Sequence, residues 1–308
     1  MKHVFLINPR AGKRDQTARL RGLADRLAAA HGLEVSCLLT DRLGGAEAIA
    51  RALAETGEPV RIYACGGDGT VHEAANGIAG YENAAMTVIP TGTGNDFLKN
   101  FGPDAAKFSD PENLWDGPDF PLDLIDCNGR YCLTIACNGI DAQVAESVHQ
   151  LGSSPLLSGR GSYLVSVAVN FLFRGIGHHW TVFLDEERLE GDFALISMCN
   201  GRYYGGGSTP IPWARMDDGK LHTILINSVS RPTFARLFGA YSAGKAGQMP
   251  QLARISDARV VRIQSAGQDI VTCLDGEGFR SREVTMRLAD KHLNFFGPKG
   301  CDPNATAR

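Results

Sequence analysis

Short apolar runs alternate with helix-like segments over the first third of the chain, and this alternation constrains the fold more than any other feature of the sequence. Runs such as HVFLI and MTVIP are typical of strands that are buried on both faces. Parallel strands need a long crossover connection, which is usually a helix. The alternation therefore predicts an α/β domain with a parallel sheet and helices on both of its faces. Strands are expected at 3–7, 33–40, 60–65 and 86–90, and helices at 15–31, 46–55 and 71–78.

Strand-like runs dominate the chain from about residue 181 onward. Several lie roughly ten residues apart with turn signals between them, which predicts an antiparallel second domain, either a β-sandwich or a barrel. The pair Asn128-Gly129 lies between two apolar runs and predicts an earlier hairpin. Helices are expected at 162–173 and 231–243, and the Pro-, Asp- and Gly-rich stretch 102–123 is interpreted as a connector with little regular structure.

Composition narrows the function classes. The net charge is −3 and no run of Lys and Arg stands out, which argues against a nucleic-acid partner bound through its phosphates. The eight cysteines include no pair with two-residue spacing, so we expect no zinc knuckle or thioredoxin-type motif, and reduced thiols in a cytosolic protein. The longest apolar stretch, 163–173, is too short to span a bilayer. Any membrane contact is therefore expected to be peripheral.

The stretch CGGDGT at 65–70 follows an expected strand and opens an expected helix. Backbone N–H groups in a first helical turn lack internal partners, and glycine allows the chain to approach a ligand closely. The stretch is therefore a candidate phosphate cradle. Asp68 would repel a phosphate unless a cation or a proton transfer intervenes, which suggests a metal–nucleotide complex or a general base. The alternative is a tight turn with Asp68 as the helix N-cap.

Two further loops of this kind follow other strands. We name the three segments the NP loop (8–13), the GGDG loop (66–70) and the PTG loop (89–97). In an open α/β sheet, ligands bind beyond the carboxyl ends of the strands, where these loops would meet. Three ordinary connections are the alternative, but the shared Gly, hydroxyl and amide content favours phosphate binding.

The three motifs NPRAG, GGDGTVHEAANGI and PTGTGNDF, in this order, resemble the diacylglycerol kinase catalytic domain, a lipid kinase family that includes bacterial lipid kinases and sphingosine kinases. The resemblance continues through the segments 137–144, 210–226 and 274–277. It implies an N-terminal α/β domain of the NAD-kinase or phosphofructokinase kind and a C-terminal antiparallel β-sandwich. We expect these domains at 1–125 and 126–291, with the segment 292–308 packing back on the first.

The resemblance also implies site residues. Glu277 is the general base by similarity to bacterial members, whereas sphingosine kinases would assign that role to Asp68. Asp141 is a candidate hydrogen-bond partner of the substrate head group. Magnesium would be held by the carboxylate of Asp218 and by two backbone carbonyls, those of Arg215 and Lys220. The residues expected to line the nucleotide are Asn8, Thr40, Gly66, Gly67, Asp68, Gly69, Thr70, Val71, His72, Thr93 and Asn95.

Taken without the resemblance, the acidic motifs allow other interpretations. Asp275 and Glu277 lie two residues apart and would share one face of an extended chain, although LDGEG also fits a hairpin turn with solvated acids. MDDG at 216–219 also fits a type I turn. The apolar segment 159–175 is a candidate wall of a lipid pocket, or else a helix that covers the second domain's core.

The combined interpretation is an ATP- and Mg²⁺-dependent lipid kinase that transfers the γ-phosphate to a lipid hydroxyl, diacylglycerol or a related alcohol. We expect it to be cytoplasmic and peripheral to the inner face of the membrane, and a homodimer is left open. Two alternatives remain at this point, which are a NAD kinase-like enzyme and a nucleotide-binding regulator without turnover.

Overall fold

The computed structural model describes residues 1–92, 94–152 and 177–305, and these fall into two compact units. The first unit contains residues 1–124 together with the stretch that begins at residue 290, and the second contains residues 125–289. The candidate lipid-pocket wall at 159–175 and the helix expected at 162–173 lie outside the described residues.

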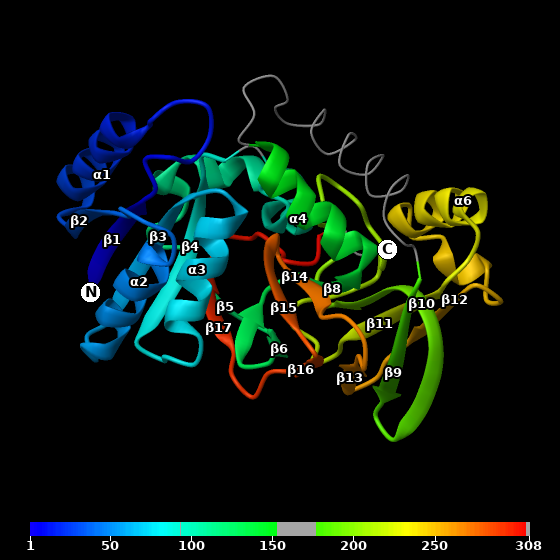
Figure 1. Ribbon diagram of the computed structural model, residues 1–308. Helices are drawn as coiled ribbons and strands as arrows, with labels where there is room; N and C mark the ends of the chain where they lie inside the picture. The colour runs from blue at the N-terminus through cyan, green and yellow to red at the C-terminus, as the bar shows by residue number, and fades with distance from the viewer. Residues whose placement is uncertain (93, 153–176, 306–308) are drawn as a thin grey trace. The chain divides into compact units, whose positions relative to one another are not determined.

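The first unit is built on a six-stranded sheet with the order β2-β1-β3-β4-β17-β5 (Figure 1). The four strands expected from the sequence run parallel, which confirms the prediction of a parallel sheet. Their bounds are β1 (Lys2–Ile7), β2 (Glu34–Leu39), β3 (Val60–Gly66) and β4 (Ala84–Pro90). β17 (Leu293–Phe296) lies parallel to β4, and β5 (Asp119–Leu122) pairs antiparallel with β17. The crossover helices are α1 (Thr17–His31), α2 (Gly45–Glu55) and α3 (Asp68–Ile78).

The connector at 102–123 has more regular structure than its composition predicts. It contains part of the 3₁₀ helix η1 (Phe97–Ser109), all of η2 (Pro111–Asn113) and β5, so the prediction was wrong there. The reason is aromatic packing, which no local pattern shows. Phe101 and Phe108 are fully buried and pack on each other and on Phe295, with ring centroids 4.9 to 6.0 Å apart.

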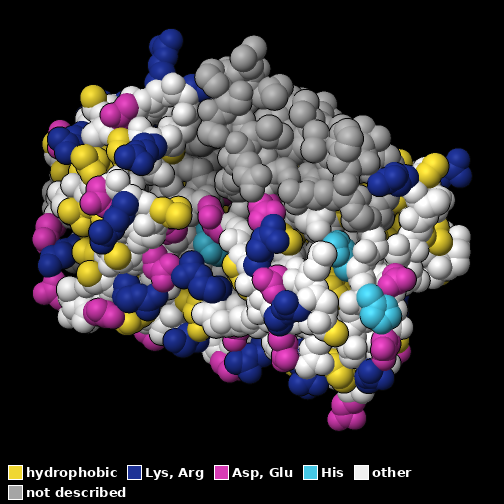
Figure 2. Space-filling view, viewed as in Figure 1, with side chains coloured by type: hydrophobic (Ala, Val, Ile, Leu, Met, Phe, Trp, Pro, Cys, Tyr) yellow, Lys and Arg dark blue, Asp and Glu magenta, His cyan; other side chains and the backbone are white. Residues whose placement is uncertain are grey.

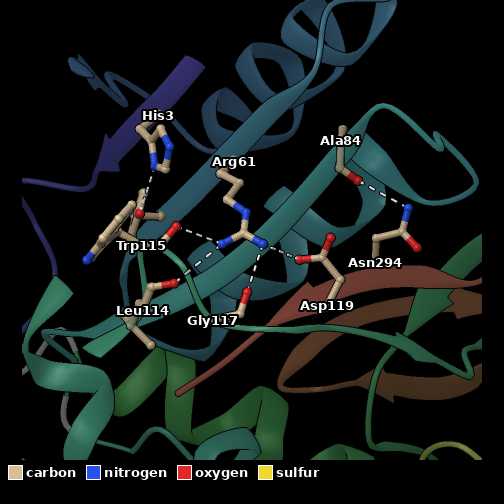
Figure 3. A network of polar contacts seen from close by, with 9 residues as sticks. His3, Arg61, Ala84, Leu114, Trp115, Gly117, Asp119 and Asn294 are labelled. Atoms are coloured by element: carbon tan, nitrogen blue, oxygen red, sulfur yellow. Dashed lines mark hydrogen bonds and ion pairs between the residues drawn. The ribbon is translucent and has the colours of Figure 1, made fainter. Parts of the chain in front are cut away.

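Arg61 of β3 fixes the rest of this connector to the sheet (Figure 3). Its guanidinium donates hydrogen bonds to the carbonyl oxygens of Trp115 (2.8 Å) and Gly117 (2.9 Å) and forms an ion pair with Asp119 (2.7 Å). It also lies 4.5 Å from the ring centroid of Phe296. The Arg61 side chain is only 11% exposed, so these bonds replace most of its hydration.

We therefore expect Arg61→Ala to lower the free energy of unfolding by about 3 kcal/mol, because several charge-assisted bonds are lost and the carbonyls lose their donor. Urea unfolding followed by circular dichroism measures this. The control is Arg287→Ala, which removes a half-exposed ion pair with Asp126 and should cost about 1 kcal/mol or less. Equal effects of the two changes would contradict the assignment.

The second unit is an antiparallel sheet with the order β15-β14-β8-β10-β9-β13-β16-β6-β7, and β11 pairs with β10 and β12. Every strand pair described in it is antiparallel, which confirms the predicted class. The strands are β6 (Ile125–Cys127), β7 (Arg130–Cys132), β8 (Ile135–Gly139), β9 (His178–Leu184), β10 (Glu187–Cys199), β11 (His222–Asn227), β12 (Ala253–Ser256), β13 (Val260–Gln264), β14 (Ile270–Leu274), β15 (Glu277–Ser281) and β16 (Glu283–Leu288).

Local sequence patterns predicted some, but not all, of the turns and helices in this unit. The β6–β7 hairpin has its turn at Asn128 (φ 50°) and Gly129 (φ 84°), and a two-residue type I′ turn requires positive φ at both positions. The predicted hairpin is therefore confirmed. α6 (Arg231–Ser242) matches the expected helix. α4 (Ile140–Gly152), followed later by the short η3 (Ala246–Gln248), was not predicted. α4 directly follows the apolar strand β8, so the change from the strand period of apolar residues to the helix period was not recognised in the sequence.

Among the described residues, no helix has the length and apolar character needed to cross a membrane. On the face shown in Figure 2, basic and acidic side chains are interspersed over the described surface. That mixture agrees with the small net charge of −3.

Candidate active site

The NP loop and the GGDG loop touch at the carboxyl edge of the first unit's sheet. Asn8 follows β1, and its Nδ2 donates a hydrogen bond to the Thr70 hydroxyl of α3 (2.9 Å). The Asn8 side-chain oxygen accepts from the Arg10 N–H (3.0 Å), and the Asn8 N–H donates to the Cys65 carbonyl (3.0 Å). Asn8 therefore shapes its own loop and joins it to the first turn of the neighbouring helix.

The PTG loop approaches the NP loop and the GGDG loop closely at glycine positions. A Cβ on Gly12, which has φ +79°, would lie 2.2 Å from the Thr91 carbonyl oxygen. A Cβ on Gly92 would lie 2.5 Å from the Gly67 Cα, so these two backbones cross in near contact. The N–H groups of Thr91 and Gly92 both donate to the Gly66 carbonyl, at 3.0 and 3.1 Å. Side chains at these positions would force the three loops apart.

Asp68 is the first residue of α3, and its N-cap is Gly67, so the N-cap interpretation of Asp68 was wrong. The Asp68 Oδ1 instead accepts the backbone N–H of Asp96 in the PTG loop (3.0 Å). The second oxygen faces Gly94, where a Cβ would come within 2.6 Å of it. Asp68 is half-buried and holds the GGDG and PTG loops together.

Two buried polar atoms of the PTG loop have no hydrogen-bond partner among the described residues. They are the Thr91 hydroxyl oxygen and the Asn95 side-chain oxygen. The Asn95 Nδ2 donates to the Gly92 carbonyl (3.0 Å), and the residue has φ 52°. A buried acceptor or hydroxyl without a hydrogen-bond partner destabilises the folded protein, and a ligand that bonds to it removes this destabilisation. Thr91 was not among the residues expected to line the nucleotide, and Thr93, which was, lies outside the described residues.

The other expected nucleotide residues differ in what they can offer a ligand. Thr40 follows β2 and is 7% exposed, and its N–H donates to the Ile7 carbonyl (2.9 Å) at the end of β1. The Val71 N–H is already used within the helix, where it donates to the Gly67 carbonyl (3.1 Å). Val71 and His72 are buried in the core of the unit. The GGDG loop therefore offers a ligand its backbone at 67–70 rather than the side chains that follow.

Glu277 belongs to the second unit, where it begins β15 directly after a two-residue turn. Asp275 (φ 50°) and Gly276 (φ 106°) form that turn between β14 and β15. The turn separates Asp275 from Glu277, so the two do not share one face of an extended chain, and the hairpin-turn interpretation of LDGEG is confirmed. Asp275 is not a solvated acid either. Its carboxylate accepts the N–H groups of Leu133 (2.6 Å) and Thr134 (2.9 Å) and the Thr134 hydroxyl. Glu277 is half-buried.

The Arg215–Lys220 segment forms a turn that is exposed except for Met216, with Gly219 at φ +68°. The Asp218 Oδ1 accepts the Lys220 N–H (3.1 Å), and Asp217 pairs with the Arg215 side chain (3.4 Å). The described residues contain no group of three His, Cys, Asp or Glu side chains arranged to hold a metal. The turn offers carboxylate and carbonyl oxygens, which is the donor chemistry that magnesium prefers.

Two family models match most of the chain. Residues 2–125 match the family model of the diacylglycerol kinase catalytic domain, and residues 134–297 match that of the YegS C-terminal NAD kinase beta sandwich-like domain. The chain belongs to the diacylglycerol-kinase-like, YegS-like family of lipid kinases.

Two relatives and a solved structure each cover more than three quarters of this chain. A Pseudomonas aeruginosa protein named "Probable lipid kinase YegS-like" is 29% identical over 78% of this chain and 77% of its own. A Xanthomonas oryzae pv. oryzae protein of the same name is 26% identical over 94% of this chain and 95% of its own. A diacylglycerol kinase structure from Bacillus anthracis str. Sterne superposes with a TM-score of 0.67 at 22% identity, covering 96% of each chain. The last similarity supports the fold alone.

Asp141 of this lipid kinase lies at the start of α4 in the second unit and is 4% exposed. Its Oδ2 accepts hydrogen bonds from the hydroxyls of Tyr204 and Tyr241, the latter at 3.3 Å. Burial raises the pKa of this carboxyl to about 6, and the two tyrosine hydrogen bonds act against that rise. As the structure stands, both tyrosines compete with any substrate for this oxygen.

The raised pKa of Asp141 predicts a pH-dependent stability. Because the folded-state pKa lies above the ordinary 3.8, the stabilising contribution of the protonated form is complete at low pH and is lost as the pH rises through about 6. Relative to Asp141→Asn, the wild type should lose about 3 kcal/mol of unfolding free energy as the pH rises through this range. Urea unfolding of both proteins between acid and neutral pH measures the difference, and parallel stability curves would contradict it.

Proposed function

We propose that this lipid kinase transfers the γ-phosphate of ATP to the hydroxyl of a diacylglycerol-like lipid in a magnesium-dependent reaction. The observation that carries the proposal is the meeting of three glycine-rich loops at the carboxyl edge of one parallel sheet. The orphan polar atoms of Thr91 and Asn95 in one of those loops support it. A triphosphate would supply the charge that such loops bind.

The backbone of the GGDG loop would hold the nucleotide phosphates. The N–H groups at the start of α3 have no partner within the helix, and the helix dipole favours negative charge at that end. Asn8 would brace this turn through Thr70, and Gly92 would allow the PTG loop to close against Gly67. Thr40, Thr93 and Asn95 would line the remaining nucleotide surface.

Magnesium, when bound, would neutralise charge that develops on the transferring phosphoryl group. The residues that fit it are Asp218 through its carboxylate and Arg215 and Lys220 through their carbonyl oxygens. Gly219, with φ +68°, lies in the turn between Asp218 and Lys220.

Glu277 would accept the proton of the lipid hydroxyl as the lipid oxygen bonds to the γ-phosphorus. The bond from that phosphorus to the β–γ bridging oxygen then breaks, and ADP leaves. Asp68 is the other candidate base. One of its oxygens already accepts the Asp96 N–H in the contact that joins the GGDG and PTG loops, so we assign Asp68 to holding the loops. We further propose a cytoplasmic enzyme that acts peripherally at the inner face of the membrane.

The test is transfer of labelled phosphate from ATP by the wild-type protein. The acceptors are diacylglycerol, monoacylglycerol, a sphingoid base and phosphatidylglycerol, each in mixed micelles, with NAD in a parallel reaction. A labelled lipid that depends on Mg²⁺ supports the proposal. Labelled NADP without labelled lipid would make the protein a NAD kinase instead. ATP that binds, in a thermal-shift assay, and is never consumed would indicate a regulator.

A further inference from the structure

The turn that precedes Glu277 is clamped by a bend elsewhere in the second unit. Leu133 and Thr134 form this bend between β7 and β8 and are 3% and 4% exposed. Their N–H groups donate to the two carboxylate oxygens of Asp275, and the Ile135 N–H lies 3.4 Å from one of them. The Asp275 N–H in turn donates to the Ile135 carbonyl (3.3 Å). The position of the turn is therefore set by the bend.

The opposite side of the same bend is held by the segment 200–202. The Thr134 carbonyl accepts the N–H groups of Asn200 (2.8 Å) and Gly201 (2.9 Å), and the Asn200 Nδ2 donates to the Leu133 carbonyl (2.7 Å). A Cβ on Gly201 would lie 3.1 Å from the Thr134 side chain, so the contact is also close in packing. The bend is hydrogen-bonded on both sides.

Arg202 continues this chain of contacts to the Arg215–Lys220 turn. It is 1% exposed, and its Nη1 donates to the Ala214 carbonyl (2.7 Å). Ala214 directly precedes Arg215, and Met216 packs within 3.4 Å of the position that a Cβ on Gly201 would take. A buried guanidinium is held firmly, because any movement away from its acceptors exposes an uncompensated charge.

We propose that Asp275 and Arg202 are positioning residues that hold Glu277 and the Asp218 turn in a fixed relation to each other. The inference rests on the proposed function, in which Glu277 accepts the proton and Asp218 binds magnesium. Partly buried hydrogen bonds connect the Asp275 carboxylate to the bend at 133–134, and further bonds connect the bend to the segment 200–201. The next residue in the chain, Arg202, bonds the Ala214 carbonyl. Several hydrogen bonds to one bend restrict its movement, and a catalytic constellation needs groups that are held in a fixed geometry.

The first test is Asp275→Asn. The amide keeps the shape of the side chain but turns one acceptor oxygen into a donor that faces a backbone N–H. We expect kcat for lipid phosphorylation to fall about 10-fold, a fraction of the loss that a displacement of about 1 Å can cause, with KM for ATP unchanged. Thr134→Val removes only the hydroxyl donor and should give a smaller loss of kcat, which keeps the test valid if Asp275→Asn folds poorly.

Asp185→Asn is the matched control. Asp185 also has a positive φ (52°) in a hairpin turn, and its carboxylate also accepts two backbone N–H groups, those of Arg259 and Val260 at 2.9 Å. The register of β10 places the two turns at opposite ends of that strand, about 40 Å apart at 3.3 Å per residue. A defect that follows from loss of any turn carboxylate would therefore appear in both variants.

The second test is Arg202→Lys, compared with Arg254→Lys at the exposed ion pair with Glu187. Lysine keeps the charge but loses the fixed fork of donors. We expect Arg202→Lys to weaken binding of Mn²⁺ alone, measured by electron paramagnetic resonance, by about 10-fold, with kcat falling in parallel and Arg254→Lys unchanged.

The outcomes separate this inference from the proposed function. If the wild type phosphorylates no lipid, the proposed function fails and the inference falls with it. If the wild type is active and Asp275→Asn matches Asp185→Asn in kcat, only the positioning role is overturned. Unchanged Mn²⁺ binding by Arg202→Lys would overturn the part assigned to Arg202.

Discussion

Replacing Glu277 with glutamine is expected to lower kcat for lipid phosphorylation by about 1,000-fold, because the amide has no affinity for the hydroxyl proton at neutral pH. KM for ATP should change by no more than about twofold, since in the proposed mechanism Glu277 contacts the lipid hydroxyl and not the nucleotide. Steady-state transfer of labelled phosphate, with ATP and lipid varied in turn, gives both constants. The substitution keeps the size of the side chain and leaves the neighbouring turn unchanged.

Glu186→Gln is the matched control for this experiment. Glu186 is an exposed glutamate in the β9–β10 turn of the same unit, and its replacement should leave kcat within about twofold of the wild type. Asp68→Asn is the informative comparison. If Glu277→Gln retains wild-type turnover while Asp68→Asn loses it, the proton acceptor is Asp68, and our assignment is wrong.

The parallel half of the fold could be predicted because its signals are local. An apolar run buried on both faces and a helix-like crossover each occupy one continuous stretch, as β1 and α1 do. The structure at 102–123 could not be predicted in this way. Phe101 and Phe108 are buried by Phe295, which lies far along the sequence, and composition alone gives no sign of such a contact.

The candidate site shows the same division. The glycine-rich loops were visible because glycine, Asn8 and Asp68 follow predicted strands, and their meeting follows from the rule for parallel sheets. The role of Asp275 was not visible. Its carboxylate is used by amides about 140 residues earlier in the chain, whereas the sequence shows only an acid beside a glycine. Thr91 differs again, because its place in the PTG loop was a sufficient signal. Its hydroxyl has no hydrogen-bond partner among the described residues, which is the structural reason to include it.

Gly92→Ala is expected to lower kcat/KM for ATP by about 100-fold, because the added methyl group would lie 2.5 Å from the Gly67 Cα and would push the PTG loop off the GGDG loop. Neither partner in that contact is a flexible side chain that could move aside. The stabilisation of the protein by ATP, measured as a rise in melting temperature, should shrink in the same variant. These two measurements report nucleotide binding without reference to the identity of the lipid.

Gly22→Ala provides the control within the same unit. Gly22 lies within α1, and outside the helix backbone the described atom nearest to its Cβ would be the end of the Arg26 side chain, at 3.9 Å. Alanine there should raise the free energy of unfolding by up to about 1 kcal/mol and leave KM for ATP unchanged. If Gly92→Ala also keeps the wild-type KM for ATP and the full ATP-dependent rise in melting temperature, the nucleotide does not bind where these loops meet. The cradle would then be only a packing contact between strand ends.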